Sequence, residues 1–136
     1  MKIEEQVLSI KQMKHLQELG VDTSDASMCW LDFEDNESME VAVFVPKIML
    51  GYTTCKVYPT YTISDLIEKL PDSIDGVHGI PYNRKILIEG KYAEACYTNG
   101  GDYCPFLYSH STLIKLLYNL LCVVAESHKE LLKMRH

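Results

Sequence analysis

The sequence predicts an α+β fold in the order helix, hairpin, helix, hairpin, helix. Three observations predict it: two pairs of alternating apolar segments joined by polar turns, two short capped amphipathic segments, and a long apolar segment at 113–125. Strands joined by short turns pair antiparallel, so we expect a mostly antiparallel sheet of about four strands with helices on one face. The 136 residues suit a single domain, 1–136.

The first helix has a clear beginning and end in the sequence. Ser9 is a favourable N-cap, and Gln12 follows three residues later, which is the capping-box pattern. An apolar residue then recurs every third position, and Gly20 is placed to end the helix as its C′ residue. The apolar positions are Ile10, Met13, Leu16 and Leu19.

The first hairpin is predicted over residues 27–33 and 39–45. Met28, Trp30 and Asp32 face one side of the first strand, and Cys29, Leu31 and Phe33 face the other. The acidic and polar residues 34–38 form the turn. A short extended segment is possible at 53–58.

The second helix is capped by Thr62 or Ser64, and Pro71 ends it. Residues 72–81 contain two glycines and a proline, which indicates a loop. The second hairpin follows at 85–89 and 91–98, where apolar and polar residues alternate.

The last helix is apolar around most of its circumference. Its polar stripe is narrow and consists of Lys115, Asn119, Cys122 and Glu126, with Ser109 or Ser111 as the cap. Thirteen apolar-rich residues are too few to cross a bilayer, which needs about twenty, so no membrane association is expected. We expect this segment to form the central core helix. A second copy of the chain could cover its surplus apolar surface as a homodimer.

Composition argues against nucleic-acid binding and indicates the compartment. The formal charge of −6 makes nucleic-acid binding unlikely, and Lys11, Lys14 and His15 on the first helix are the weak candidates for it. Five cysteines, no CxxC pair and no apolar leader predict a reducing, cytoplasmic location.

Several residue constellations resemble reactive sites without meeting their requirements. Cys29-Trp30 resembles a papain-type nucleophile, but Ala26-Ser27-Met28 precedes it instead of the glycine and second cysteine of that signature. Counting an EF-hand loop from Asp32 puts Glu37 and Val43 where glycine and glutamate are required.

The spacing of the candidate residues matches neither a metal site nor a phosphate-binding loop. Cys96, Cys104 and His110 lack the close ligand pairs of a zinc site. The segment 99–102 contains neither phosphate-binding glycine motif. We therefore assign no catalytic, cofactor-binding or metal residue and expect no cofactor.

Tyrosine offers the one candidate contact surface. Its side chain combines apolar area with a polar tip, which favours contact surfaces. Five tyrosines cluster in or beside predicted loops, and we propose them as a contact patch: Tyr58, Tyr61, Tyr97, Tyr103 and Tyr108.

Segments 8–30, 58–66 and 116–125 resemble a family of small uncharacterised proteins of gut Bacteroidetes and their prophages. The shared features are a helix start, a Tyr-Pro entry to a second helix and a terminal packing helix. The resemblance implies a cytoplasmic, phage-related accessory protein and carries over no functional residue.

The sequence therefore favours a non-enzymatic accessory or interaction protein that acts through contacts with an unknown protein partner. The alternative is a small ligand-binding protein or enzyme with an unrecognised pocket near His78, Glu89, Glu94 and residues 99–103.

Overall fold

The computed structural model describes residues 5–33, 39–45, 49, 55–74, 81–89, 92–98, 106–110 and 112–127. Within these ranges three helices and seven strands are bounded, which confirms the α+β class. In chain order they are α1 (Ile10–Glu18), β1 (Met28–Phe33), β2 (Glu40–Val43), β3 (Cys55–Thr60), α3 (Ile63–Lys69), β4 (Ser73–Ile74), β5 (Tyr82–Glu89), β6 (Tyr92–Thr98), β7 (Phe106–His110) and α4 (Leu113–Ser127).

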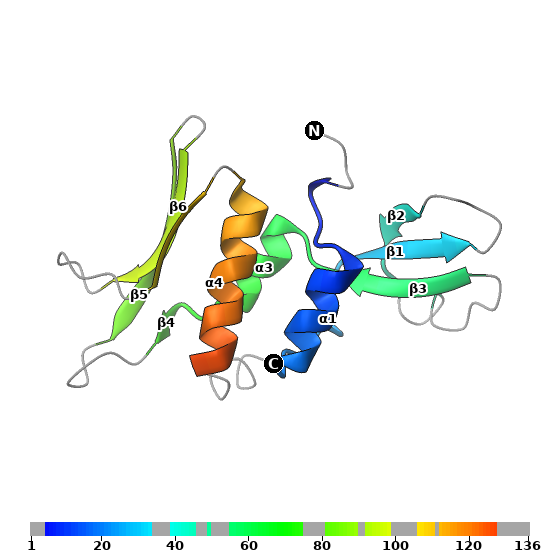
Figure 1. Ribbon diagram of the computed structural model, residues 1–136, viewed down its shortest axis with the longest axis horizontal. Coiled ribbons are helices and arrows are strands. Elements are labelled where there is room, and N and C mark those ends of the chain that lie inside the picture. Colours follow the sequence, from blue (N-terminus) through cyan, green and yellow to red (C-terminus); the bar gives the residue numbers. More distant parts are fainter. Residues whose placement is uncertain are drawn as a thin grey trace.

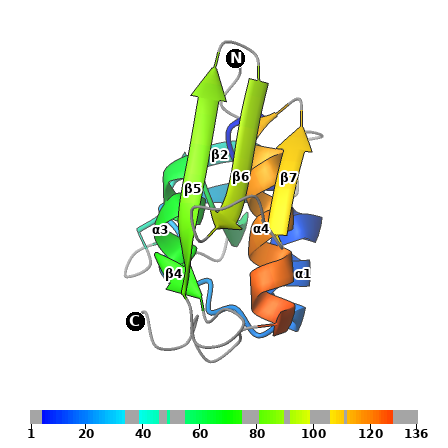
Figure 2. The same cartoon turned by 90° about the vertical axis from the view of Figure 1, so that its left-hand side faces the viewer.

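The helices form a layer between two antiparallel sheets (Figure 1). One sheet has the strand order β2-β1-β3, and the other has the order β4-β5-β6-β7. Helix α4 packs on β6 and β7, α3 packs on α4, and α1 packs on β3. Figure 2 shows the four-stranded sheet in front of α3 and α4, so both helices cover the same face of that sheet.

The three-stranded sheet has the two faces that the alternation predicts. Cys29 and Leu31 of β1 are buried, whereas Met28, Trp30 and Asp32 are half-buried on the opposite face. Strand β1 pairs with β2 on one side and with β3 on the other. The face of Trp30 receives the segment before α1, because Trp30 Nε1 donates a 2.8 Å hydrogen bond to the carbonyl of Leu8.

The four-stranded sheet also holds the end of α3. Arg84 Nη1 donates hydrogen bonds of 2.7 and 2.9 Å to the carbonyls of Ile67 and Leu70, which satisfies acceptors that the helix leaves without a partner at its C-terminus. Across the β5–β6 ladder from Arg84, the hydroxyl of Tyr97 donates a 2.6 Å hydrogen bond to the carbonyl of Pro71.

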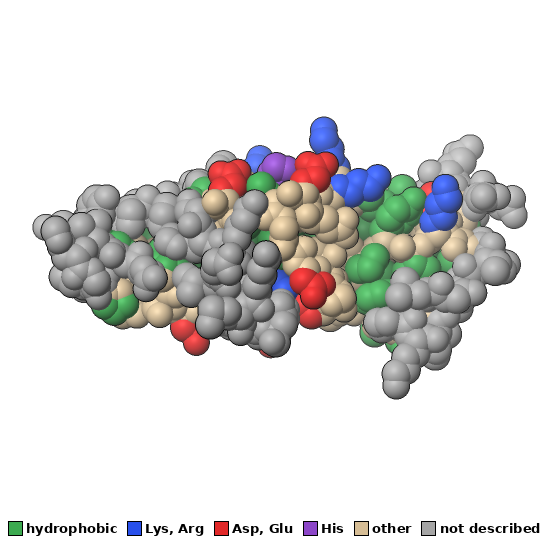
Figure 3. Space-filling view, turned by 90° about the horizontal axis from the view of Figure 1, so that it is seen from below, with side chains coloured by type: hydrophobic (Ala, Val, Ile, Leu, Met, Phe, Trp, Pro, Cys, Tyr) green, Lys and Arg blue, Asp and Glu red, His purple; other side chains and the backbone are tan. Residues whose placement is uncertain are grey.

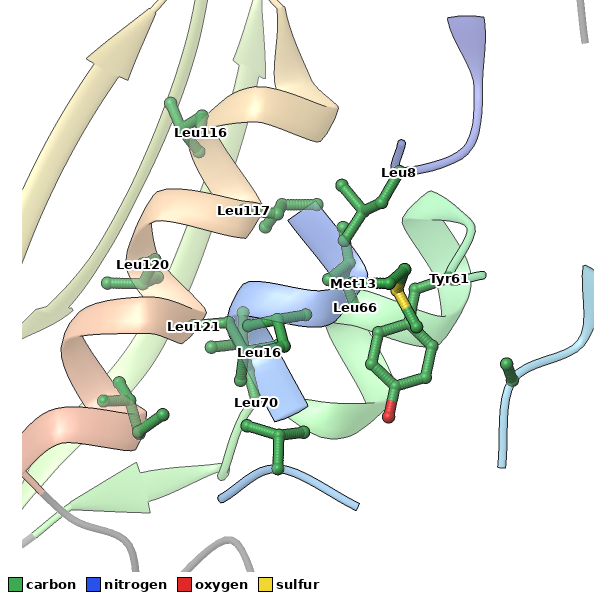
Figure 4. Packing of buried hydrophobic residues seen from close by; sticks show 14 of the residues in the cluster. Leu8, Met13, Leu16, Tyr61, Leu66, Leu70, Leu116, Leu117, Leu120 and Leu121 are labelled. Carbon is green, nitrogen blue, oxygen red and sulfur yellow. The ribbon is translucent and has the colours of Figure 1, made fainter. Parts of the chain in front are cut away.

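The core is one cluster that reaches from one sheet to the other through the helices (Figure 4). Helix α4 supplies its centre with six side chains that have no exposed surface: Leu116, Leu117, Leu120, Leu121, Val124 and Ala125. The sheet covers one side of α4 and the other helices cover another side. These apolar side chains are thus covered within one chain, and the sequence argument for a second copy does not follow from α4.

The local signals at the helix ends are confirmed. Ser9 and Gln12 form a capping box, and Thr62 forms a second one with Asp65, which decides between the two candidate caps of α3. Gly20 has φ +93°, a conformation that residues with a Cβ rarely adopt. The polar stripe of α4 is also confirmed, since Lys115 and Glu126 are exposed and Asn119 and Cys122 are half-buried.

Three expectations differ from the structure. The two hairpins belong to separate sheets, of three and four strands, so they do not pair with each other in one sheet as predicted. Strands β3 and β4 extend the two sheets, and β4 lies where a loop was predicted. Ser109 lies in β7 and is not the cap of α4, because residues 106–110 pair with β6. Ser111 and the turn 34–38 lie outside the described residues.

Candidate functional site

One face of α1 carries charged side chains over two helical turns. The capping box begins the helix after Ser9, which places Lys11, Lys14 and Glu18 at exposed positions. Residues three and four apart lie on the same helix face. The buried face of the same helix carries Met13 and Leu16, which are 3% and 0% exposed. Packing of these two side chains into the core therefore turns the charged side chains outward.

Helix α4 adds an aromatic side chain opposite this face. The ring of Tyr118 lies 6.5 Å from the ring of His15, centroid to centroid, with the two planes tilted by 59°. Burial is the main cause that raises the pKa of Tyr118, and a hydrogen bond with Cys122 adds to it. The phenol therefore stays protonated at neutral pH.

The two helices enclose a surface cavity of about 370 Å³. We call it the α1–α4 pocket. Its lining consists of Lys11, Gln12, Lys14, His15, Glu18 and Tyr118. Two lysines against one glutamate give it a net charge of +1 with His15 neutral, in a chain whose formal charge is −6. Figure 3 shows a histidine side chain beside acidic and basic ones along one edge of the molecule.

Contacts already fix several of these side chains. Gln12 Oε1 accepts a 2.9 Å hydrogen bond from the backbone N–H of Ser9, so its NH₂ group is the part that can donate to a ligand. Lys14 Nζ lies 6.0 Å from the ring centroid of Tyr58 on β3. His15 Nδ1 lies 3.8 Å from Glu18 Oε2, and both side chains are exposed.

The predicted tyrosine patch does not form as one surface. Tyr61 and Tyr97 are 0% exposed, and both hydroxyls donate hydrogen bonds to other groups of the chain, so their assignment to a contact surface is wrong. Tyr58 is half-buried beside Lys14. Tyr103 and the side chain of Tyr108 lie outside the described residues.

A second polar cluster, missed by the sequence reasoning, surrounds Tyr61. Its hydroxyl donates to Asp25 Oδ1 at 2.7 Å and lies 2.9 Å from the carbonyl oxygen of Asp22. Lys69 Nζ, whose side chain is 2% exposed, bonds to the same carbonyl at 2.7 Å and to Asp25 Oδ2 at 3.1 Å. These contacts hold the segment between α1 and β1 against α3, so we assign the cluster a structural role.

Cys29 is packed as a small apolar residue in β1, as expected. It is 0% exposed, and its thiol lies 3.7 Å from Met49 Sδ. Burial raises the pKa of this thiol, followed by the nearby Cys55, so it is not an activated nucleophile. Burial likewise raises the pKa of Cys122 beside the pocket.

The other sequence candidates are described only in part. Cys96 is buried in β6, while Cys104 and the side chain of His110 lie outside the described residues. The alternative pocket was predicted near His78 and residues 99–103, which also lie outside them. Glu94 pairs across the sheet with Leu87, which precedes Glu89 by two residues on β5. Among the described residues no group of three His, Cys, Asp or Glu side chains could hold a metal ion.

A surface of different character lies at the edge strand β2. Met39, Val43 and Val45 are 41%, 63% and 40% exposed. In the part of the chain that the structure describes, β2 pairs with β1 alone. We call these three residues the β2 edge. Large apolar side chains beside an unpaired strand edge are typical of surfaces that take a further strand.

Comparison with protein-family models, with curated proteins and with solved structures gave no match. The resemblance to small proteins of gut Bacteroidetes therefore stays a prediction. Of the described helices, none is long and apolar enough to span a bilayer.

Lys11, Lys14 and His15 were visible in the sequence as a cationic helix face, but only as a weak candidate for nucleic-acid binding. The missing signal was Tyr118. Tyr118 lies within the apolar segment of the last helix, where an aromatic residue is expected to be part of the hydrophobic core. Its position next to the polar residues Lys115 and Asn119 is the one sequence feature that marks it as a boundary residue.

Proposed function

We propose that this chain is a non-enzymatic binding protein and that a small organic anion binds in the α1–α4 pocket. The observation that carries this proposal is the pocket itself, a cavity of about 370 Å³ with a cationic helix face on one side and Tyr118 on the other. Small-molecule sites have volumes of about 300–1,000 Å³ and combine apolar walls with a few polar groups.

Local charge supports an anionic ligand. Lys11 and Lys14 lie on adjacent turns of one helix face, so both ammonium groups can reach one carboxylate or phosphate. The chain as a whole is acidic, with a formal charge of −6, whereas the residues that line the pocket carry two lysines against one glutamate. A cleft of one charge sign concentrates ligands of the opposite sign.

The chemistry around the pocket supports binding rather than catalysis. Two potential nucleophiles at or beside the pocket are the phenol of Tyr118 and the thiol of Cys122, which are four residues apart on α4. Burial raises the pKa of both, so both keep their protons at neutral pH. An activated nucleophile needs a lowered pKa or an adjacent base.

Titration with 3-phenylpropionate tests the proposal, because this anion combines one carboxylate with an aromatic body. We expect its addition to shift the NMR signals of His15 and Tyr118 in a saturable way. Replacing both lysines (Lys11→Gln with Lys14→Gln) should weaken binding roughly two- to thirtyfold, the size of two partly exposed ion pairs. Lys85→Gln on β5 is the matched control, since Lys85 is exposed on the other sheet.

Two outcomes would overturn this proposal. One is the absence of any saturable shift at the pocket residues. The other is a loss of affinity per removed charge that is equal for the Lys85 control and for the double variant, which would show that only the overall charge matters. Thermal unfolding midpoints of all variants should agree with that of the unaltered protein, because the changed side chains are exposed.

A second candidate function is contact with a protein through the β2 edge, and the exposure of Met39, Val43 and Val45 favours it. The partner could be a second copy, because antiparallel pairing of β2 with itself obeys a two-fold axis. Analytical ultracentrifugation decides this point. Dimers that dissociate on Val43→Lys would support it, and a monomer at high concentration would remove the homodimer.

We further propose a cytoplasmic location and a phage-related accessory role. The four described cysteines, Cys29, Cys55, Cys96 and Cys122, are free thiols, which suits a reducing compartment. The phage-related role rests on the sequence resemblance alone. Lysing the cells directly into denaturant with a thiol-alkylating label would test the location, because buried thiols react only once the protein is denatured and only if they were reduced in the cell.

A further inference from the structure

The α1–α4 pocket has opposite charges at its two ends. Lys11 and Lys14 lie toward the N-terminus of α1, and Glu18 is the last residue of this helix. One helical turn rises about 5.4 Å, so Lys11 and Glu18 are about two turns apart. Any ligand that lies along the helix therefore meets cations at one end and a carboxylate at the other.

We infer that the ligand of this pocket is a zwitterion, namely a free α-amino acid with an aromatic side chain. This inference rests on the proposed function, because it names the chemical class of the anion that the pocket takes. The carboxylate of the amino acid would face Lys11 and Lys14. Its ammonium group would face Glu18, and its ring would contact Tyr118.

Glu18 is available for an ammonium group. Its side chain is 76% exposed, and the one contact described for its carboxylate is the 3.8 Å approach of His15 Nδ1. That separation is longer than a hydrogen bond. The spacing of Lys14 and Glu18, four residues apart on the helix, suits a molecule whose two charges lie close together.

The polarity of α1 supports the same orientation. A helix carries partial positive charge at its N-terminus and partial negative charge at its C-terminus. The nine-residue helix α1 thus adds to the field of Lys11 at one end and to the field of Glu18 at the other. A carboxylate toward residue 11 and an ammonium toward residue 18 agree with both.

The wall opposite α1 accounts for the aromatic side chain. The rings of His15 and Tyr118 are tilted by 59° with their centroids 6.5 Å apart. Tilted rings expose both a face and an edge, and a third ring can pack edge to face against either. The ring of Tyr118 is half-buried, so part of its surface is already removed from water and part remains for a ligand.

Other ligand classes meet one end of the pocket unfavourably. A dicarboxylate aligned with the helix would bring its second carboxylate close to Glu18, and like charges repel at this range. A diamine would place one ammonium group beside Lys11 and Lys14. In an α-amino acid the ammonium and carboxylate groups are attached to the same carbon, so the carboxylate can face Lys14 while the ammonium group faces Glu18, and neither meets a like charge.

Three matched ligands test the inference on the full chain: L-phenylalanine, 3-phenylpropionate, which lacks the ammonium group, and 2-phenylethylamine, which lacks the carboxylate. Affinities are measured from the NMR shifts of His15 and Tyr118. We expect L-phenylalanine to bind roughly two- to fivefold more tightly than 3-phenylpropionate, the size of one partly exposed ion pair. We expect no saturable binding of 2-phenylethylamine.

Glu18→Gln separates a specific contact from general affinity. In this variant the advantage of L-phenylalanine over 3-phenylpropionate should disappear, while 3-phenylpropionate binds equally well or better. The matched control is Glu89→Gln, which removes an exposed carboxylate on β5 and should leave the advantage intact.

The outcomes distinguish this inference from the proposed function. If 3-phenylpropionate binds and L-phenylalanine binds no better, the zwitterion is wrong and the anion site stands. The same conclusion follows if the advantage survives in Glu18→Gln. If neither L-phenylalanine nor 3-phenylpropionate binds, or if 2-phenylethylamine binds as tightly as L-phenylalanine, both proposals are wrong.

Discussion

The hydroxyl of Tyr97 donates a 2.6 Å hydrogen bond to the carbonyl oxygen of Pro71, 26 residues earlier in the chain. Tyr97 is fully buried in β6, and Pro71 follows Leu70, the C-cap residue of α3. This bond ties the end of α3 to the middle of the four-stranded sheet. Together with Arg84, which holds the last carbonyls of the helix, it fixes how α3 meets that sheet.

Removing this hydroxyl should destabilise the fold without changing its shape. Tyr97→Phe leaves the carbonyl of Pro71 without that donor in a buried place, and such a loss costs about 1–3 kcal/mol. Denaturant unfolding measures the difference. Tyr58→Phe is the control, because Tyr58 is half-buried and its ring contact with Lys14 survives the change. Equal effects of the two variants would contradict the assigned role.

Leu117→Ala should be among the more damaging substitutions in α4. Leu117 is 0% exposed in the centre of the core, and a cavity left by its removal costs about 2–5 kcal/mol in unfolding free energy. Lys115→Ala lies two residues away on the exposed stripe and should change stability by less than about 0.5 kcal/mol. An unchanged denaturation midpoint for Leu117→Ala would show that the buried face of α4 is misplaced.

Asp25 should matter more than an ordinary surface acid. Asp25→Ala removes an acceptor shared by the Tyr61 hydroxyl and Lys69 Nζ, and both still share the carbonyl of Asp22. The side chain of Asp25 is 41% exposed, so water compensates part of the loss and we expect about 1–3 kcal/mol. Thermal unfolding measures it. Ser24→Ala, at an exposed position next to Asp25, provides the comparison.

Stability should fall at alkaline pH because of Tyr61. Burial, and then the hydrogen bond to Asp25, raise the pKa of this phenol above its ordinary value of 10.0. Above about pH 10 the unfolded chain therefore loses this proton while the folded chain keeps it, so the unfolding free energy decreases as the pH rises. Below that pH the contribution of Tyr61 is fully present.

Urea unfolding between pH 8 and about pH 11 measures this slope. Tyr61→Phe should be less stable at neutral pH, because its hydrogen bonds are lost, and its stability should depend less steeply on alkaline pH. A slope identical to that of the unaltered protein would mean that other groups cause the alkaline loss. Cys29 and Cys122 are the first to examine, since burial raises the pKa of both thiols.

Local features of the fold were predictable because their partners are close in sequence. The capping box joins Ser9 and Gln12, which are three positions apart, and the polar stripe of α4 follows from helical spacing alone. The membership of the sheets was not predictable in this way. Alternation tells which side chains share a face, but the β1–β2 and β5–β6 hairpins have the same alternation whether they join one sheet or two.

The polar interior was missed for a related reason. Tyr61 and Tyr97 look like surface residues in the sequence, because their hydroxyls find partners 36 and 26 residues away. Predicting the α1–α4 pocket likewise required knowledge of contacts between residues that are far apart in the sequence. Its cationic residues were recognised on the first helix, but Tyr118 reaches them from more than a hundred residues further along the chain.

The order of the elements has a consequence for synthesis on the ribosome. Helix α4 follows every other described element in the chain, yet its leucines fill the space between the sheets. A nascent chain that ends before residue 113 contains the strands of both sheets but lacks the helix against which they pack. Truncated translation products should therefore be bound by chaperones or degraded, and stable tertiary structure should form only after this segment has left the exit tunnel.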